Sequence, residues 1–212
     1  MSLAQERQSQ AERRSRSEDA LLEAAAELVA ERGVQGASLA SIGGRAGVSR
    51  GLPAHHFGSK DALVAQLAER AQTHVGLVIT DAQRRHAGVS GDLSVLDEIL
   101  VGVDAYFELF DEPGPDERAL LVMWGSTFPS NASVDGMADA ERRSYEGLSE
   151  RIAAGQADGS VRADVDVTAS AVLLHGLMRG VAALYLTDRR PADMQTVRQT
   201  CREWIAAALA PE

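Results

Sequence analysis

Apolar residues three and four positions apart recur along most of this chain, and this spacing constrains its fold more than any other feature. The clearest case lies on one face of a predicted helix and comprises Leu96, Ile99, Leu100, Val103, Phe107 and Phe110. Similar stripes precede and follow it, separated by glycine and proline, and no segment shows the alternation of a half-buried strand. The sequence therefore predicts an all-α fold with about nine helices.

Composition sets the class of protein. The chain has 212 residues, 45% of them hydrophobic and 25% charged, which is ordinary for a globular protein with room for two small domains. Its one cysteine, Cys201, cannot form an internal disulfide, which suits a reducing compartment. The N-terminus lacks the apolar segment of a secretory signal, and the apolar run 171–186 is interrupted by His175 and Arg179 and is too short to span a bilayer. We expect a cytoplasmic protein without a membrane segment.

Charge is distributed unevenly. Residues 1–60 hold 8 basic and 7 acidic residues, whereas residues 61–212 hold 13 and 24, so the net charge of −10 lies outside the N-terminal part. Phosphate contacts supply most of the non-specific affinity for nucleic acid, so a uniformly acidic surface would oppose binding. The asymmetry leaves nucleic-acid binding by the N-terminal part possible.

The segment 38–57 carries the strongest functional signal. Ser38 is a good N-cap for a helix, Gly47 is placed to end that helix in a left-handed conformation, and Ser49 is the next good N-cap. A second helix would then begin at Arg50. Two short helices joined by a glycine-containing turn form either a plain helix corner or a DNA-binding helix-turn-helix, whose second helix lies in the major groove. The residues nearest DNA would be Arg50, Leu52, Pro53, Ala54 and His55.

Three residues are unusual inside these two helices. Pro53 lacks an N–H, and within a helix its ring collides with the carbonyl four residues back, so it belongs either in the first turn or at the first position of a later-starting helix. Gly43 and Gly44 each weaken a helix by roughly 1 kcal/mol relative to alanine. We expect them to permit close packing against the preceding helix.

The segment from about Ser17 to Leu67 resembles the N-terminal domain of TetR-type (tetracycline-repressor-like) regulators. The matching motifs are Ala-Glu-Arg-Gly at 30–33, Ala-Gly-Val-Ser-Arg-Gly at 46–51 and His-Phe-Gly-Ser-Lys-Asp-Ala-Leu at 56–63. The resemblance implies a phosphate contact by Lys60. The chain departs from the family's usual Thr-Leu-Tyr by having Leu-Pro-Ala at 52–54. The DNA-binding residues that we predict are Ser38, Arg45, Ser49, Arg50, Leu52, Pro53, His55, His56 and Lys60.

The resemblance also implies a domain organisation. A flexible arm would span residues 1–16, a three-helix DNA-binding domain residues 17–62, and a helical effector-binding and dimerisation domain residues 63–212. The last two helices would form the homodimer interface, where Gly176 and Gly180 let another helix approach; intrasubunit packing explains the same spacing. In the arm, Arg13, Arg14 and Arg16 either contact DNA or form a solvated tail.

The implied function is a dimeric transcriptional regulator, a repressor that binds a double-stranded, near-palindromic operator and is released by an unidentified small-molecule effector. Five of the chain's nine aromatic residues fall within 106–128, which suggests an apolar pocket, although plain core packing explains them equally. The predicted ligand-binding residues are Tyr106, Phe110, Met123, Trp124, Phe128, His175, Met178 and Arg179.

Two rival functions remain at this stage. Gly-Val-Ser-Arg-Gly at 47–51 fits the Gly-x-Ser-x-Gly of hydrolases, with Ser49 as nucleophile, but that motif needs a preceding strand, and helix-capping residues precede it here. The chain could also be a helical interaction protein that keeps a DNA-binding fold without sensing a ligand. The five histidines show no metal-ligand spacing, so we expect no metal, no cofactor and no catalytic residue.

Overall fold

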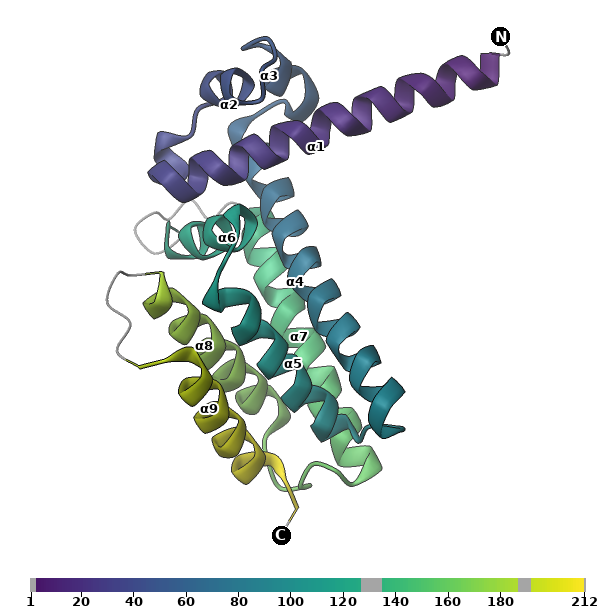
Figure 1. The fold of residues 1–212 in the computed structure, drawn as a ribbon, viewed down its shortest axis with the longest axis vertical. Helices are drawn as coiled ribbons and strands as arrows, with labels where there is room; N and C mark the ends of the chain where they lie inside the picture. Colours follow the sequence, from purple (N-terminus) through teal and green to yellow (C-terminus); the bar gives the residue numbers. More distant parts are fainter. Residues whose placement is uncertain (1–2, 127–134, 187–191, 212) are drawn as a thin grey trace. The chain divides into compact units, whose positions relative to one another are not determined.

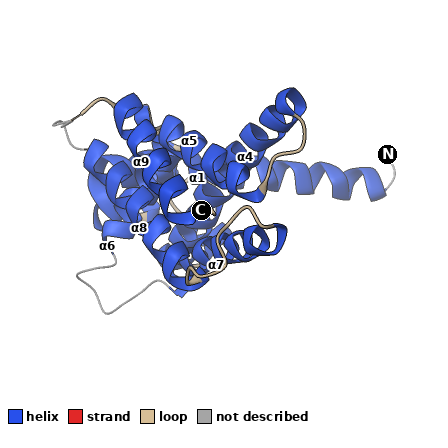
Figure 2. Ribbon diagram, turned by 90° about the horizontal axis from the view of Figure 1, so that it is seen from below, coloured by secondary structure: helices blue, strands red, loops and turns tan. Residues whose placement is uncertain are grey.

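The computed structural model describes residues 3–126, 135–186 and 192–211. These residues form nine helices. Figure 2 draws the described part of the chain as helices and loops without a strand, which confirms the all-α prediction for that part. The helices are α1 (Leu3–Gly36), α2 (Leu39–Arg45), α3 (Leu52–Phe57), α4 (Lys60–Ser90), α5 (Val95–Asp111), α6 (Pro115–Ser126), α7 (Asp135–Asp158), α8 (Val167–Tyr185) and α9 (Met194–Leu209).

The chain divides into two compact units. The first comprises residues 1–71 and 114–137, and the second comprises residues 72–113 and 138–212. Helix α6 belongs to the first unit because it packs on α1 (Figure 1), whereas the sequence had placed it in the C-terminal domain. The functional division at residue 63 remains a prediction.

The core of the first unit is built on the predicted apolar stripe of α1. Leu21, Ala25, Leu28 and Val29 are all at most 1% exposed. Helix α1 is interrupted at Gly33, which has φ 72° and ψ 168°, a conformation that glycine adopts without strain.

The N-terminal arm differs from the expectation of an irregular segment. Helix α1 begins at Leu3, so the described part of the arm is helical. Residues 3–16 contain no glycine or proline and are rich in Ala, Gln, Glu and Arg, which favour helix. The Arg14 Nε atom also donates to the Glu18 Oε1 atom at 3.1 Å, one helical turn away. These local preferences favour extension of the helix toward the N-terminus.

Helix α5 forms the centre of the second unit. It packs against α8 and α9 (Figure 1), and the predicted apolar stripe from Leu96 to Phe110 is buried. Its first turn is capped by Ser94, whose hydroxyl accepts from the Asp97 N–H at 3.1 Å. Beside this stripe Asp104 accepts a hydrogen bond from Arg202 of α9 at 2.7 Å. Apolar burial and this ion pair together hold α9 on α5.

Helix α8 begins four residues before the apolar run 171–186. With these residues its 19 residues are long and apolar enough to cross a membrane by length and composition alone, a test that the core helices of globular proteins also pass. Most of the helix is nevertheless not buried within the chain. One face carries the buried residues Ala171, Leu174 and Ala182, and the opposite face remains exposed.

Candidate DNA-binding site

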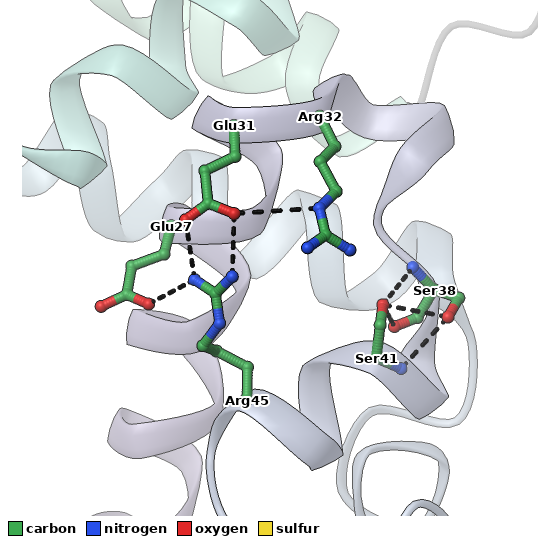
Figure 3. A network of polar contacts seen from close by, with 6 residues as sticks. All are labelled: Glu27, Glu31, Arg32, Ser38, Ser41 and Arg45. Carbon is green, nitrogen blue, oxygen red and sulfur yellow. Dashed lines mark hydrogen bonds and ion pairs between the residues drawn. The ribbon is translucent and has the colours of Figure 1, made fainter.

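Capping at Ser38 fixes the start of α2. The Ser38 hydroxyl accepts from the Ser41 N–H at 3.1 Å, and the Ser41 hydroxyl accepts from the Ser38 N–H at 3.0 Å, which is a reciprocal capping box (Figure 3). At the other end Gly47 has φ 69°, the left-handed conformation predicted for it. The Val48 N–H then returns to the Gly43 carbonyl at 2.9 Å. The predicted turn between the two helices is therefore present.

The predicted start of the second helix was wrong. Helix α3 begins at Leu52 with Gly51 as its N-cap, and Arg50 lies in the preceding turn. A helix beginning at Arg50 would put Pro53 at its fourth position, where its ring would meet the Ser49 carbonyl. With α3 starting at Leu52, Pro53 is the second residue, where no N–H is needed, and the Ser49 carbonyl accepts from the Leu52 N–H at 3.0 Å.

Pro53 does not reach the DNA-facing surface. Its side chain is less than 2% exposed, so the prediction that it lies near DNA was wrong. It packs toward Gly43, where an added β-carbon would stand 3.2 Å from the Pro53 Cδ atom and 2.8 Å from the Ser49 carbonyl oxygen. Gly43 therefore permits close packing against this turn and α3, not against the first helix as expected. At Gly44 nothing lies within 4 Å, and nothing in the structure explains that glycine.

The exposed end of the helix-turn-helix is formed by the turn before α3 and the outer face of α3. Ser49, Arg50, Ala54 and His55 are exposed there, and Leu52 is half-buried. Within the described part of the chain the Arg50 guanidinium has no hydrogen bond or ion pair. A cation in the turn before the second helix and an imidazole on the exposed face of that helix are groups that can bind base edges.

Arg45 is directed toward α1 instead. Its Nη1 atom donates to Glu27 at 2.8 Å and to Glu31 at 2.9 Å, and its Nη2 atom donates to Glu31 at 2.8 Å (Figure 3). The hydrogen bonds that Arg45 donates to Glu31 and then to Glu27 raise the pKa of Arg45 above its ordinary value. A second cation, Arg32, lies 3.8 Å from Glu31. Arg45 thus holds α2 on α1, and its charge is already partnered.

His56 is likewise turned inward. Its side chain is 8% exposed, and its Nδ1 atom lies 3.3 Å from the Glu18 Oε1 atom. Hydrogen bonds from Arg14 and then His56 lower the pKa of the Glu18 carboxyl. Glu18 therefore links the N-terminal part of α1 to α3. This contact could not be predicted from the sequence, because His56 lies 38 positions after Glu18.

Lys60 and Ser38 stand at helix starts. The Lys60 Nζ atom donates to the Gln35 carbonyl at 3.4 Å. The neighbouring Ser59 hydroxyl accepts from the Ala62 N–H at 3.1 Å and so caps the first turn of α4. Ser38 is exposed while it caps α2. Both residues lie beside the exposed end of the helix-turn-helix, at positions suited to a phosphate contact. The contact itself remains a prediction.

The predicted ligand residues are distributed over both units. Tyr106, Phe110, His175, Met178 and Arg179 belong to the second unit, whereas Met123 and Trp124 belong to the first. Phe128 lies outside the described residues. In the first unit Met123 is fully buried and Trp124 is half-buried.

In the second unit a buried polar cluster surrounds Glu141, a residue that the sequence analysis did not single out. Its Oε2 atom lies 2.9 Å from the His175 Nε2 atom, and its Oε1 atom accepts from Arg179 Nη2 and from Gln72 Nε2, the latter at 3.3 Å. Burial by itself raises the pKa of Glu141, but the hydrogen bond to His175 and the charge of Arg179 outweigh burial and lower it. Glu141 thus remains a carboxylate inside the helix bundle.

Two polar atoms of this cluster have no hydrogen-bond partner among the described residues. They are the Tyr106 hydroxyl and the Arg179 Nη1 atom, on residues 4% and 3% exposed. Burial raises the pKa of Tyr106 to about 12, and the charges of Arg179 and Glu141 also act on it. The Tyr106 ring packs on Phe110 with centroids 4.5 Å apart.

The described residues offer little geometric support for a metal site or for a hydrolase nucleophile. No group of three His, Cys, Asp or Glu side chains there is placed to hold a metal ion. The segment before Gly47 is helix α2, not the strand that a hydrolase nucleophile at Ser49 requires.

Comparison with known proteins identifies the class. A family model described as bacterial regulatory proteins of the tetR family matches residues 21–67, which include the capped turn and α3. A second model, described as the C-terminal part of BetI-type transcriptional repressors, matches residues 102–210, just over half of the chain. The chain belongs to the TetR family of bacterial transcriptional regulators and binds DNA through its helix-turn-helix.

Three proteins are similar to this chain over most of its length. It is 27% identical to the HTH-type transcriptional regulator BetI of Burkholderia thailandensis, over 90% of this chain and 92% of the relative. A TetR-family regulator from Rhodococcus sp. has the same fold, with a TM-score of 0.78, 20% identity and coverage of 92% of this chain and 100% of that one. A regulator from Saccharomonospora viridis in complex with choline superposes with a TM-score of 0.70, 24% identity and coverage of 93% and 100%.

Proposed function

We propose that this protein is a one-component repressor that binds a near-palindromic operator as a homodimer and leaves it when a small molecule occupies the C-terminal part. The observation that carries the DNA-binding part is the exposed end of the helix-turn-helix, where Arg50 and His55 stand free of the ion pairs that hold Arg45 and His56. Arg50 and His55 would contact base edges, and Lys60 would contact phosphate.

Dimerisation is supported by an apolar face of α8. Leu173, Gly176, Gly180 and Leu184 follow one another at three- and four-residue spacing and so lie on one side of the helix. Leu173 is 73% exposed and Leu184 is 56% exposed, and a β-carbon on either glycine would meet nothing within 4 Å. A helix of a second copy can approach such a face closely, and exposed apolar surface of this kind is typical of interfaces.

On α9, the apolar residues fall into two groups. Met194, Cys201, Ile205 and Leu209 are buried within the chain, so for these the intrasubunit explanation holds. Trp204 is 66% exposed and is available to a partner. A two-fold dimer would place its recognition helices roughly 34 Å apart, one turn of DNA, and would read a palindromic site.

Ligand release would operate by linkage. A ligand that binds the conformation with mis-spaced recognition helices more tightly weakens operator binding by that difference in affinity. The buried polar cluster around Glu141 supports a ligand site in the second unit, because a packed core does not need such a group of charges. Choline, found in the S. viridis regulator, is one compound to test.

The remaining assignments follow from this function. We expect the protein to act in the cytoplasm, where it meets DNA, and not to be an enzyme. The alternative is a helical interaction protein that keeps the DNA-binding fold without sensing a ligand. Ester hydrolysis abolished by Ser49→Ala would revive the hydrolase hypothesis.

The experiment that tests the proposal is transcription in vitro from a promoter that carries the operator. Added protein should lower transcription, and an effector should restore it. Activation of transcription would contradict the repressor role. Equal affinity of an effector for the free and the operator-bound protein would contradict ligand release.

A further inference from the structure

In the polar cluster around Glu141, hydrogen-bond donors outnumber the acceptors available to them. Both oxygens of Glu141 are engaged, one by His175 and the other by Arg179 and Gln72. The atoms that lack a partner among the described residues are the Tyr106 hydroxyl and the Arg179 Nη1 atom, and both can donate. The cluster therefore has donors left over and no free carboxylate oxygen.

Leaving such donors unsatisfied destabilises a protein. More than nine tenths of Tyr106 and of Arg179 is buried, so bulk water does not replace the missing partners. Tyr106 lies on α5 and Arg179 on α8, two helices that pack together, and the Arg179 charge acts on the Tyr106 hydroxyl. Two buried donors on facing helices suit one acceptor group placed between them.

We propose that the effector presents an oxygen acceptor, a carboxylate or a carbonyl, to the Tyr106 hydroxyl and the Arg179 Nη1 atom. This inference rests on the proposed ligand release and names the chemistry of the ligand. The rings of Phe107 and Phe110 lie beside Tyr106, at centroid distances of 5.7 and 4.5 Å, so the adjacent part of the ligand is apolar.

The same arrangement disfavours a quaternary ammonium at this cluster. Such a group accepts no hydrogen bond, so it would leave both donors unsatisfied, and the Arg179 charge would repel it. Glu141, the negative charge of the cluster, already has its oxygens occupied. A choline-like cation would therefore have to bind elsewhere or in another orientation.

The first variant for the test is Tyr106→Phe, which removes only the unpartnered hydroxyl. In the absence of ligand its Tm should rise by roughly 2–4 °C, because a buried unsatisfied group is gone. Tyr185→Phe is the matched control, since the Tyr185 hydroxyl is also buried but donates to the Ala192 carbonyl at 2.6 Å. Its Tm should fall.

The ligand probes are acetate, hexanoate and decanoate, their primary amides, and choline, with affinities measured by calorimetry. At least one carboxylate or amide should bind the wild-type protein, and binding should weaken about tenfold in Tyr106→Phe. Arg179→Lys, which keeps a charge beside Glu141 but loses the guanidinium fork, should weaken it similarly. Preference for carboxylates over amides, or the reverse, decides which acceptor the site takes.

Several results would overturn the inference: no binding by any carboxylate or amide, equal binding by wild type and Tyr106→Phe, or choline binding that depends on the Tyr106 hydroxyl. Operator affinity is measured in the same samples. Tyr106-dependent binding that leaves operator affinity unchanged supports the site and contradicts ligand release. If a compound lowers operator affinity but binds wild type and Tyr106→Phe equally, the result supports ligand release and contradicts the site.

Discussion

The backbone at Gly43 lies against the Ser49 carbonyl so closely that a β-carbon at position 43 would stand 2.8 Å from that oxygen. This contact joins α2 to the turn that carries Arg50. The position of Arg50 therefore depends on the absence of a side chain seven residues earlier.

Gly43→Ala should destabilise the DNA-binding unit by about 1–3 kcal/mol, because the turn must move to admit a methyl group. Gly44→Ala is the control: nothing lies within 4 Å of it, and alanine favours helix, so stability should rise by up to about 1 kcal/mol. Urea unfolding of both variants measures this difference. Equal effects of the two substitutions would contradict the close contact.

Arg50→Ala should reduce operator affinity by about 1–3 kcal/mol and relax the base preference at one position of each half-site. Stability should not change, since Arg50 has no partner among the described residues. Lys60→Ala should instead weaken binding to all sequences and reduce the salt slope by about 1. Titrations of operator and of scrambled DNA at several salt concentrations separate the two effects, and an unchanged base preference in Arg50→Ala would count against base contact.

Leu173→Glu and Trp204→Glu should convert the dimer to monomers, because each places a charge in the proposed apolar interface. Leu77→Glu on α4 is the matched control, since Leu77 is 63% exposed and lies on another helix of the second unit. Light scattering coupled to gel filtration gives the mass of each species. A monomeric wild type, or dissociation only in the control, would contradict the interface on α8 and α9.

Glu141→Gln should destabilise the protein by about 2–3 kcal/mol at pH 6, below the range for a fully buried pair because 21% of the Glu141 side chain is exposed. The pKa of Glu141 is lowered from 4.5 in the folded state. Its stabilising contribution is therefore complete above about pH 4.5 and disappears as the pH falls through the lower folded pKa. Urea unfolding at a series of pH values should show the two proteins converging below about pH 4.5; a constant difference would contradict an ionised Glu141.

Local chemistry made part of this structure predictable. Capping by Ser38 and Ser59 and the left-handed Gly47 depend on residues within one turn, so their positions followed from the sequence. The start of α3 did not follow from the sequence. Ser49 as an N-cap favours a helix that begins at Arg50, whereas Pro53 favours a later start. Proline decided the outcome, since its steric conflict outweighs one capping hydrogen bond.

Tertiary contacts were beyond sequence reasoning. Adjacent histidines look alike in the sequence, yet His55 is exposed and His56 faces Glu18 of α1. Arg45 was predicted to bind DNA, but in the folded protein it pairs with Glu31 and Glu27, which lie 14 and 18 positions earlier. Glu141 gave no periodic or motif signal, and its role depends on helices brought together by folding.

The central claim is that a dimer reads DNA with the exposed end around Arg50, and selection of bound sequences from a random DNA pool at near-physiological salt tests it most directly. The account predicts enrichment of a palindrome whose half-sites lie one or a few helical turns apart. Arg50→Ala should lose that enrichment at one base per half-site. No enrichment over non-specific binding, or the same enriched sequence from Arg50→Ala, would contradict it.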